Sequence, residues 1–348
     1  MDASPLRSAL QQVAQGLPLS RSEAAAAFAV IMEGRATPAQ AGALLLGLRA
    51  RGETAEELAG AAQALRSAMV RLPIENPDAL VDTCGTGGGT FGTVNLSTAA
   101  AFIAVGAGVP VAKHGNRSYT SKSGSADLLE ALGIDIGLSP EKSLELLRSV
   151  GFVFLFAPSY HPAMRHLATV RKELGVATIM NLVGPLVNPA GVRRQIVGVS
   201  DAARAPLMAA ALAALGAKHA LVLHATAGMD EISPSGCTYV WEVREGRIQQ
   251  WELNPVHYGL DCEDMEGLAG GEPDYNAREI ERMLEGRGHA ALRCAALLNA
   301  AAALYVSDNG WSFDEAVSRA TRALETGLAA GVLERARLMA PRKLSTSG

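Results

Sequence analysis

The segment VDTCGTGGGTFGTVNLST, residues 81–98, concentrates residue types that bind phosphate groups. Its glycines are Gly85, Gly87, Gly88, Gly89 and Gly92. Glycine loses more backbone conformational entropy on folding than any other residue. A run of glycines therefore indicates a turn or a close approach that leaves no room for side chains. A short apolar run precedes these glycines, and a helix-like run begins near Ser97 and Thr98. Loop amides followed by a helix N-terminus form an anion site. Phosphate binding is therefore the functional interpretation, and a tight strand-to-helix turn is the plain structural alternative.

The residues after the glycines indicate which class of phosphate ligand this segment binds. GGGTFG at 87–92 fits the pattern GxGxxG, but a dinucleotide site also needs an acidic residue about 20 positions further on. No Asp or Glu occurs between Asp82 and Asp127, and the chain contains no GxxxxGK[ST]. The interval instead holds the cations Lys113, Arg117 and Lys122, with Asn95, Ser97, Asn116, Ser118, Ser121 and Ser123. This composition suits a ligand with several phosphates.

The segment AKHGNRSYTSKSGSAD, residues 112–127, directly follows the apolar run VPVA. It supplies a cation, an imidazole, an amide and a hydroxyl-rich loop. A charged run is usually a solvated face of the protein. Its position after a predicted strand, next to the glycine loop, favours a second part of the same site.

Asp230 and Glu231, in GMDEIS, follow another apolar run, ALVLHA. Adjacent carboxylates at a strand end can bind Mg²⁺, which prefers carboxylate oxygens together with substrate phosphate oxygens and water. A solvated acidic turn is the alternative interpretation of these two residues.

The segment YHPAMRHLATVRKELG, residues 160–175, predicts a basic helix. His161 and His166 lack the spacing of metal ligands on a helix, which argues against zinc. Arg171 can hold a carboxylate through two hydrogen bonds. Taken alone, the segment is more typical of a solvated basic helix.

The elements that must position these residues fall into two regions. Residues 5–72 contain only helical patterns, at 20–34, 37–52 and 54–70, and the proline-containing stretch 71–79 follows as a linker. Strand-length apolar runs then occur at 79–85, 109–115, 151–158, 177–182, 194–200 and 219–225. Helical segments separate them at 97–108, 123–133, 139–150 and 205–217. Such alternation predicts an α/β fold with a mainly parallel central sheet flanked by helices. A hairpin is expected at 238–255, with its turn at Glu245 and Gly246, and helices from Asn276 to Arg337.

Composition excludes several classes of protein. The net charge of −4 argues against a general nucleic-acid binder. The four cysteines form no CxxC, so neither a zinc site nor a disulfide framework is expected. The N-terminal residues MDASPLRSALQQ contain no apolar segment of a secretion signal, and no apolar run reaches membrane-spanning length. We expect a cytoplasmic protein with no membrane partner.

Together these motifs resemble the anthranilate phosphoribosyltransferase family of tryptophan biosynthesis. The resemblance covers nearly the whole chain. It rests on the GTGG loop, NLST, KHGNRS, SKSGSADLLEALG, HPAMRH, VRKELG, NLVGPLVNPA, DEIS and LLNAAAALYV. It implies a small N-terminal helical domain, residues 1–74, completed by a helical segment near 162–190. It also implies a large α/β domain, residues 75–348, and a homodimer joined through the helical domains.

The resemblance also implies a reaction and its site. The phosphoribosyl group of 5-phosphoribosyl 1-pyrophosphate (PRPP) is transferred to the amine of anthranilate with Mg²⁺, in a cleft that closes between the domains. PRPP would be bound by Gly85, Gly88, Thr93, Asn95, Ser97, Thr98, Lys113, Arg117, Ser121, Ser123 and Gly124. Anthranilate would be bound by Gly85, His114, Asn116, His161, Met164, Arg165, Arg171 and Gly184. The catalytic residues would be Lys113, His114, Asn116 and Arg171, and Mg²⁺ would be held by Ser97, Asp230 and Glu231.

One position departs from the family pattern. The family has GTGGDG, whereas this chain has Gly88-Gly89-Thr90. The usual loop aspartate is absent, so we expect an altered Mg²⁺ dependence rather than an inactive protein.

Three other functions stay open at this point. One is a pyrimidine nucleoside phosphorylase, although its motifs fit the KHGNRS and DEIS regions poorly. Another is a non-catalytic relative that binds nucleic acid. The third is the same transferase fold with a different aromatic acceptor.

Overall fold

The N-terminal region of the computed structural model is a helical bundle; the structure describes residues 4–87, 92–118 and 122–342. The bundle consists of α1 (Ser4–Ala14), α2 (Arg21–Met32), α3 (Pro38–Arg51) and α4 (Ala55–Ala68). Ser20, Thr37 and Thr54 each cap a helix through a reciprocal capping box with Glu23, Gln40 and Glu57. These caps are the start signals expected from the sequence, and the three predicted helices are confirmed.

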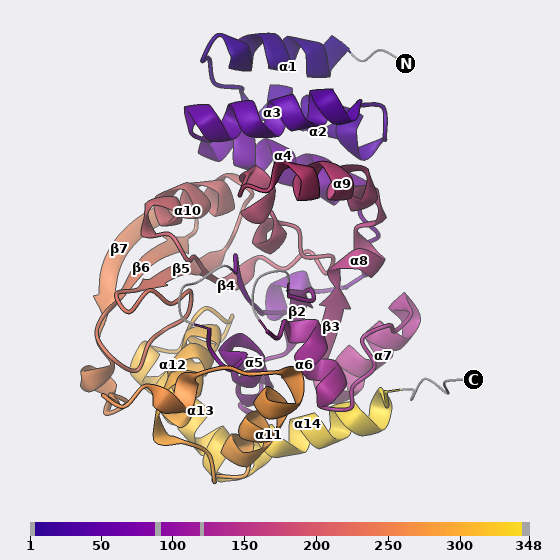
Figure 1. Ribbon diagram of the computed structural model, residues 1–348. Coiled ribbons are helices and arrows are strands. Elements are labelled where there is room, and N and C mark those ends of the chain that lie inside the picture. Colours follow the sequence, from indigo (N-terminus) through magenta and orange to yellow (C-terminus); the bar gives the residue numbers. More distant parts are fainter. Residues whose placement is uncertain (1–3, 88–91, 119–121, 343–348) are drawn as a thin grey trace.

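A mostly parallel sheet forms the centre of the larger region (Figure 1). Its strands are β1 (Asp82–Gly85), β4 (Arg194–Gly198), β5 (His219–Ala225), β6 (Thr238–Arg244) and β7 (Arg247–Leu253), in that spatial order. β1, β4 and β5 are parallel, and the predicted hairpin β6–β7 adds two antiparallel strands. Its turn contains Glu245 (φ 50°) and Gly246 (φ 79°). β2 (Val111–Gly115) and β3 (Phe152–Phe156) form a parallel pair, which the bridge between Val81 and Val111 joins to the β1 edge.

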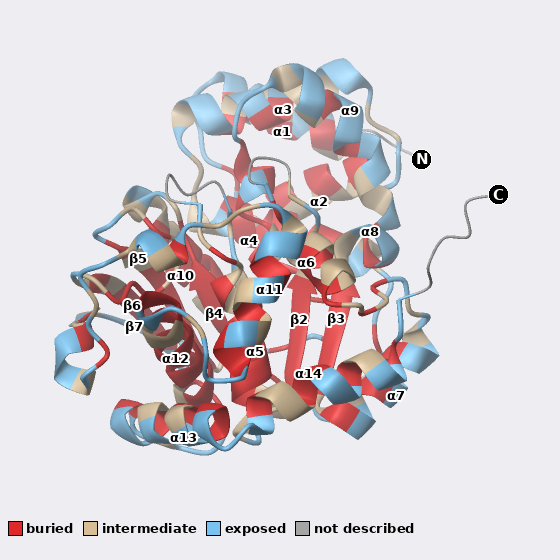
Figure 2. Ribbon diagram, turned by 60° about the horizontal axis from the view of Figure 1, so that its bottom comes forward, coloured by how far each residue is buried: buried red, intermediate tan, exposed pale blue. Residues whose placement is uncertain are grey.

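Both faces of β4 and β5 are buried, which explains the apolar runs at these strands, whereas the edge strand β7 is largely exposed. Leu221 and Leu223 of β5 face one core, whereas Ala220 and Val222 face the other, as the two-residue period of a strand requires. The first core is covered by α5 (Leu96–Gly106), α6 (Ser125–Ala131), α7 (Pro140–Val150), α11 (Pro273–Leu284), α12 (Ala290–Tyr305), α13 (Phe313–Glu325) and α14 (Leu328–Met339). In Figure 2, α5, β2, β3 and β4 are coloured largely as buried, in the middle of the large region.

The second core is continuous with the helical bundle. Side chains of α9 (Arg165–Leu174) and α10 (Ala205–Ala214) pack with the bundle and with β4, β5 and β6. Arg21 donates to the Ala214 carbonyl (2.7 Å), and Arg66 donates to the Leu186 carbonyl (2.6 Å). Figure 1 shows α4 lying between the rest of the bundle and α9 and α10.

One strand prediction is wrong. Residues 177–182 do not form a strand; they contain the 3₁₀ helix η3 (Ile179–Asn181). Thr178 caps this turn, because its hydroxyl accepts from the Met180 amide (3.3 Å) and its amide donates to the Asn181 side chain (3.1 Å). Ile179 and Met180 are apolar because they enter the core shared with the bundle, not because they pair with a strand.

The remaining short elements connect the regular ones. They are α8 (Ala157–Tyr160), η1 (Pro77–Ala79), η2 (Pro162–Met164), η4 (Gly184–Leu186), η5 (Ala202–Arg204), η6 (Pro255–Tyr258) and η7 (Glu266–Leu268). Within the described ranges, no helix has both the length and the apolar character needed to cross a membrane.

Two glycines of the bundle provide a matched test of its packing. A Cβ at Gly60 would lie 2.5 Å from the Arg21 carbonyl oxygen and 2.9 Å from the Ala25 nitrogen, both backbone atoms of the α2 region. A Cβ at Gly42 would meet only Val170 at 3.7 Å and Leu174 at 4.0 Å. Helix propensity favours alanine by about 1 kcal/mol at either site. Overpacking, which costs about 1–3 kcal/mol, should outweigh that gain at Gly60 alone.

We therefore expect Gly60→Ala to lower the thermal unfolding midpoint and Gly42→Ala to leave it unchanged or raise it. Scanning calorimetry on both variants measures this. Equal midpoints for the two variants would contradict the close packing of α2 against α4.

Candidate functional site

Three of the predicted segments, with the glycines, the basic residues and the acidic pair, lie at one edge of the sheet, where the parallel strands end. β1 ends at Gly85, β2 at Gly115, β4 at Gly198 and β5 at Ala225. In a parallel α/β sheet, ligands bind at the carboxyl ends of the strands. The loops that follow these strands carry the glycine segment, the basic segment and the acidic pair, which places all three within reach of one ligand.

The acidic pair contacts the glycine segment directly. Glu231 accepts hydrogen bonds from the Thr93 hydroxyl (2.7 Å) and the Ser97 amide (3.1 Å). Asp230 Oδ2 accepts from the Gly87 amide (3.2 Å). The tertiary fold thus joins Glu231 to Ser97 across 134 positions of the chain.

Two glycines make this approach possible. A Cβ at Gly198 would lie 1.5 Å from the Asp230 carbonyl oxygen, and a Cβ at Gly85 would lie 2.8 Å from Asp230 Oδ2. Only a residue without a side chain fits at position 198, where the acidic loop crosses the end of β4, and a side chain at position 85 would displace the Asp230 carboxylate.

Burial of the acidic pair gives it an electrostatic character that suits a divalent cation. Burial raises the pKa of Asp230, and burial together with the adjacent Asp230 charge raises the pKa of Glu231. Among residues 4–87, 92–118 and 122–342, no group of three or more His, Cys, Asp or Glu side chains could hold a metal. Two carboxylates and the Ser97 hydroxyl fit Mg²⁺, which completes its coordination with substrate phosphate oxygens and water.

Lys113 lies beneath this part of the site. Its Nζ donates to the Thr83 carbonyl and to Ser97 Oγ (3.0 Å). Burial lowers the pKa of Lys113, and the nearby Asp82 opposes that shift. Thr98 is fully buried, and its hydroxyl has no hydrogen-bond partner within the described residues. Because it binds Ser97, the Lys113 ammonium group lies at the first turn of α5, where the predicted phosphate site lies.

The second segment joins the first through an amide network. The Asn95 side chain donates to the Ser123 carbonyl (3.1 Å), and Ser123 Oγ donates to Asn95 Oδ1 (3.2 Å). Asn276, at the start of α11, also donates to Asn95 Oδ1 (3.0 Å). Gly124 is the N-cap of α6, and its amide donates to Asp127 (3.0 Å). The structure thus brings Asn95, Ser123 and Gly124 together.

The Arg117 side chain is paired with carboxylates of α6 and not with the glycine segment. Its guanidinium donates to Asp127 (2.7 Å) and to Glu130 (2.7 and 2.8 Å) of α6. It also lies 5.7 Å from the centre of the Phe156 ring. Here the side chain predicted to close over PRPP is held by two carboxylates. Asn116, next to it, accepts from the Arg117 amide (2.8 Å).

Two buried histidines form the other side of the site. The His114 and His161 ring centres are 5.1 Å apart. His114 Nδ1 lies 3.3 Å from the Gly184 carbonyl oxygen, so this nitrogen carries the proton when the bond forms. Nε2 of each ring has no hydrogen-bond partner within the described residues. Burial, with His161 nearby, lowers the pKa of His114 to about 3, and burial lowers the pKa of His161 to about 4. Both rings are therefore neutral near pH 7.

The remaining predicted anthranilate residues lie on or beside α9. Met164 packs against the bundle core, Arg171 is half-buried near the end of the helix, and Arg165 is exposed at its start. Gly88 and Ser121, both predicted to bind PRPP, lie outside the described residues, as does Gly89.

Three buried polar residues were missed as site residues by sequence reasoning. Asp82 accepts from the His114 amide (3.1 Å), Asn276 supports Asn95, and Asn299 contacts the main chain next to Glu231. An asparagine within the apolar run LLNAAAALYV is a usable sequence signal, because a buried amide needs partners.

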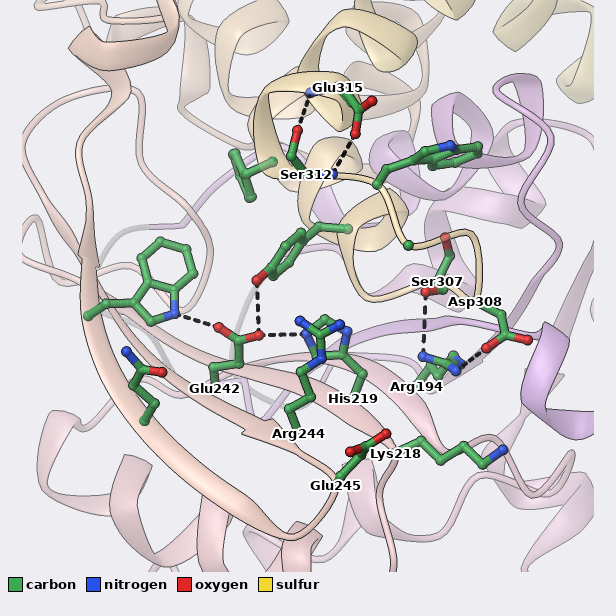
Figure 3. Close-up of a pocket in the computed structure, with 16 residues that line it drawn as sticks. Arg194, Lys218, His219, Glu242, Arg244, Glu245, Ser307, Asp308, Ser312 and Glu315 are labelled. Atoms are coloured by element: carbon green, nitrogen blue, oxygen red, sulfur yellow. Dashed lines mark hydrogen bonds and ion pairs between the residues drawn. The ribbon is translucent and has the colours of Figure 1, made fainter.

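A second cleft lies at the opposite, amino ends of β4 and β5 (Figure 3). Its Glu242 accepts from His219 Nε2 (2.7 Å), Trp251 Nε1 (2.9 Å) and the Tyr305 hydroxyl (3.0 Å). Arg194 pairs with Asp308. These polar groups satisfy one another, and the cleft is far from the gathered site residues.

The low pKa of His114 predicts a specific effect of acid on stability. An unfolded histidine binds a proton below about pH 6.5, whereas buried His114 stays neutral down to about pH 3. The contribution of neutral His114 to the free energy of unfolding is therefore fully present above pH 6.5. It falls by about 1.4 kcal/mol for each pH unit below that value.

We expect His114→Asn to reduce the dependence of the unfolding free energy on pH between 6.5 and 4. Urea unfolding at a series of pH values measures the slope. His257→Asn, at an exposed histidine, is the control and should keep the wild-type slope. An unchanged slope in His114→Asn would show that His114 is not held neutral.

Comparisons with known proteins agree with this arrangement. The glycosyl transferase family a/b domain matches residues 77–330, and the helical bundle domain of a glycosyl transferase family matches residues 7–69. The anthranilate phosphoribosyltransferase of Rubrobacter xylanophilus is 50% identical over 330 residues, covering 95% of this chain and 96% of the relative. That of Brevibacillus brevis is 46% identical over 332 residues, covering 95% and 97%.

Solved structures show the same likeness in three dimensions. Anthranilate phosphoribosyltransferase from Thermus thermophilus has a TM-score of 0.89 and 41% identity, covering 95% of this chain and 98% of its own. The Saccharomyces cerevisiae enzyme, in complex with PRPP and Mg, has a TM-score of 0.84 and 30% identity, covering 95% and 96%. The chain belongs to the anthranilate phosphoribosyltransferase family.

Proposed function

We propose that this chain transfers the 5-phosphoribosyl group of PRPP to the amine of anthranilate and releases pyrophosphate, in tryptophan biosynthesis. The observation that carries the proposal is the contact of Asp230 and Glu231 with the glycine segment, through Gly87, Thr93 and Ser97. This contact places two carboxylates beside loop amides and a helix N-terminus, the combination that a magnesium-bound pyrophosphate needs.

The pyrophosphate end of the site stabilises the leaving group. Bound Mg²⁺, held by Ser97, Asp230 and Glu231, supplies positive charge to the departing pyrophosphate. Loop amides and Lys113 add preorganised donors that need no rearrangement as charge develops. The PRPP residues are Gly85, Gly88, Thr93, Asn95, Ser97, Thr98 and Lys113, with Arg117, Ser121, Ser123 and Gly124 closing over the substrate. For that closure, the Arg117 guanidinium releases the Asp127 and Glu130 carboxylates and binds a phosphate group of the substrate.

The acceptor end orients the amine. Nε2 of His114 carries a lone pair without a partner in the described residues, and it accepts a hydrogen bond from the anthranilate amine. Its low pKa makes it a weak base, which suits an arylamine that is already a neutral nucleophile. Arg171 grips the carboxylate, and Asn116 helps aim the amine at the ribose carbon. Gly85, His161, Met164, Arg165 and Gly184 line the path.

We assign residues 1–74, with 162–190, to a small helical domain, and residues 75–348 to a large domain. The assembly is a homodimer joined through the helical domains. Leu17, Leu46 and Val176, on the helical part, are 49%, 47% and 51% exposed, and their burial between two copies would stabilise the dimer. The location is cytoplasmic, in keeping with four free cysteines.

The decisive experiment follows the loss of anthranilate fluorescence with and without PRPP and Mg²⁺. We expect loss only when all three are present, because each supplies a part of the same reaction. Turnover of thymidine with inorganic phosphate would favour a nucleoside phosphorylase instead. Salt-sensitive DNA binding without anthranilate turnover would favour the nucleic-acid-binding alternative. No turnover at either low or high Mg²⁺ would overturn the proposal.

The glycine at position 89, where the family has an aspartate, gives a second prediction. Gly89→Asp restores the family's loop carboxylate next to the magnesium-bound substrate, so the Mg²⁺ concentration for half-maximal rate should fall. The control is Gly92→Asp, which adds the same charge where a side chain has open space. A Mg²⁺ titration of both variants measures the effect, and an unchanged titration in Gly89→Asp would contradict it.

A further inference from the structure

Asn299 is a buried amide in the middle of an apolar helix. It lies in α12, between Leu298 and Ala300, and is 5% exposed. An amide in such surroundings is costly unless its donors and acceptor are satisfied. Three hydrogen bonds satisfy it. One is a donation to the Ala295 carbonyl of its own helix (2.8 Å), and the other two go to a single residue outside the helix.

That residue is Ile232, which directly follows Glu231. Asn299 Oδ1 accepts from the Ile232 amide (3.0 Å), and Asn299 Nδ2 donates to the Ile232 carbonyl (2.9 Å). The side chain therefore binds both main-chain groups of one residue, as a neighbouring strand would. This pair of bonds fixes both the position and the rotation of the backbone at Ile232.

The helix that carries Asn299 also packs against the helix that carries Ser97. α12 packs against α5, and both contribute to the first core. The first turn of α5 carries Ser97, whose amide binds Glu231. Asn299 also lines, with Ser97, Asp230 and Glu231, the small cavity behind the acidic pair. The distance between the carboxylates and Ser97 is thus set by two helices packed side by side.

We propose that Asn299 is a positioning residue for the magnesium–pyrophosphate end of the site. It holds Ile232 so that Asp230 and Glu231 face Ser97 and Gly87, and it touches no substrate itself. This inference rests on the proposed function, because it assumes that the acidic pair meets magnesium-bound PRPP.

The test compares PRPP binding in the presence of Mg²⁺ by titration calorimetry, independently of turnover. Asn299→Leu keeps the branched shape but removes both bonds to Ile232. We expect its affinity for PRPP with Mg²⁺ to fall about 10–100-fold, the usual effect of losing a residue that supports metal ligands. The KM for anthranilate should stay unchanged, because the hydrogen bonds of Asn299 go to Ile232 and Ala295 and not to the predicted anthranilate residues. Asn299→Ala removes the same two bonds, and a water that bridges Ile232 would recover only part of them, so its loss of affinity should be smaller but still measurable.

Gly60→Ala is the control for stability alone, since it strains the helical bundle and not the acidic loop. It should bind PRPP as the wild type does. If Asn299→Leu does not fold, the Asn299→Ala affinity decides. Wild-type affinity in the folded Asn299 variants, or an equal loss for both substrates, would overturn the inference. Absence of PRPP binding in the wild type would instead overturn the proposed function.

Discussion

The crossing of the acidic loop over Gly198 is the constraint on which the rest of the site depends. At this point the Asp230 carbonyl occupies the space that a side chain at position 198 would fill. The crossing lets Asp230 and Glu231 reach the Gly87 and Ser97 amides, so the carboxylates and the glycine loop become one surface. Without it, the acidic pair in the β5–β6 loop and the phosphate loop after β1 would be separate features.

The central strands of the sheet supply the rigidity for this arrangement, because both faces of β4 and β5 are buried in cores. One core includes α5 and α12, whose packing fixes the first turn that carries Ser97 and the helix that carries Asn299. The other core extends into the bundle through α9 and α10. The two ends of the proposed reaction rest on different sets of elements. The pyrophosphate end is built on the sheet and α5, whereas the helix α9 with Arg171 packs with the bundle.

Much of this could be predicted from sequence. The caps at Ser20, Thr37 and Thr54, the apolar strands and the Glu245–Gly246 turn each follow from local patterns that the structure keeps. Residues 177–182 were mispredicted because an apolar run of strand length also fits a 3₁₀ turn that packs into a core, and periodicity alone does not separate the two. The roles of Asn276 and Asn299 could not be predicted either, because their partners lie 181 and 67 positions away in the chain.

The sequence by itself determined the family, the fold class and the residue types available for chemistry, because motif identity and local periodicity are encoded over short stretches. Only the tertiary structure decided which of those residues meet. It paired Glu231 with Thr93 and Ser97, turned Arg117 toward Asp127 and Glu130, and buried His114 beside His161. The physical reason is that pKa shifts, close backbone approaches and long-range hydrogen bonds depend on burial and distance. Both quantities are fixed only when segments far apart in the chain pack against one another.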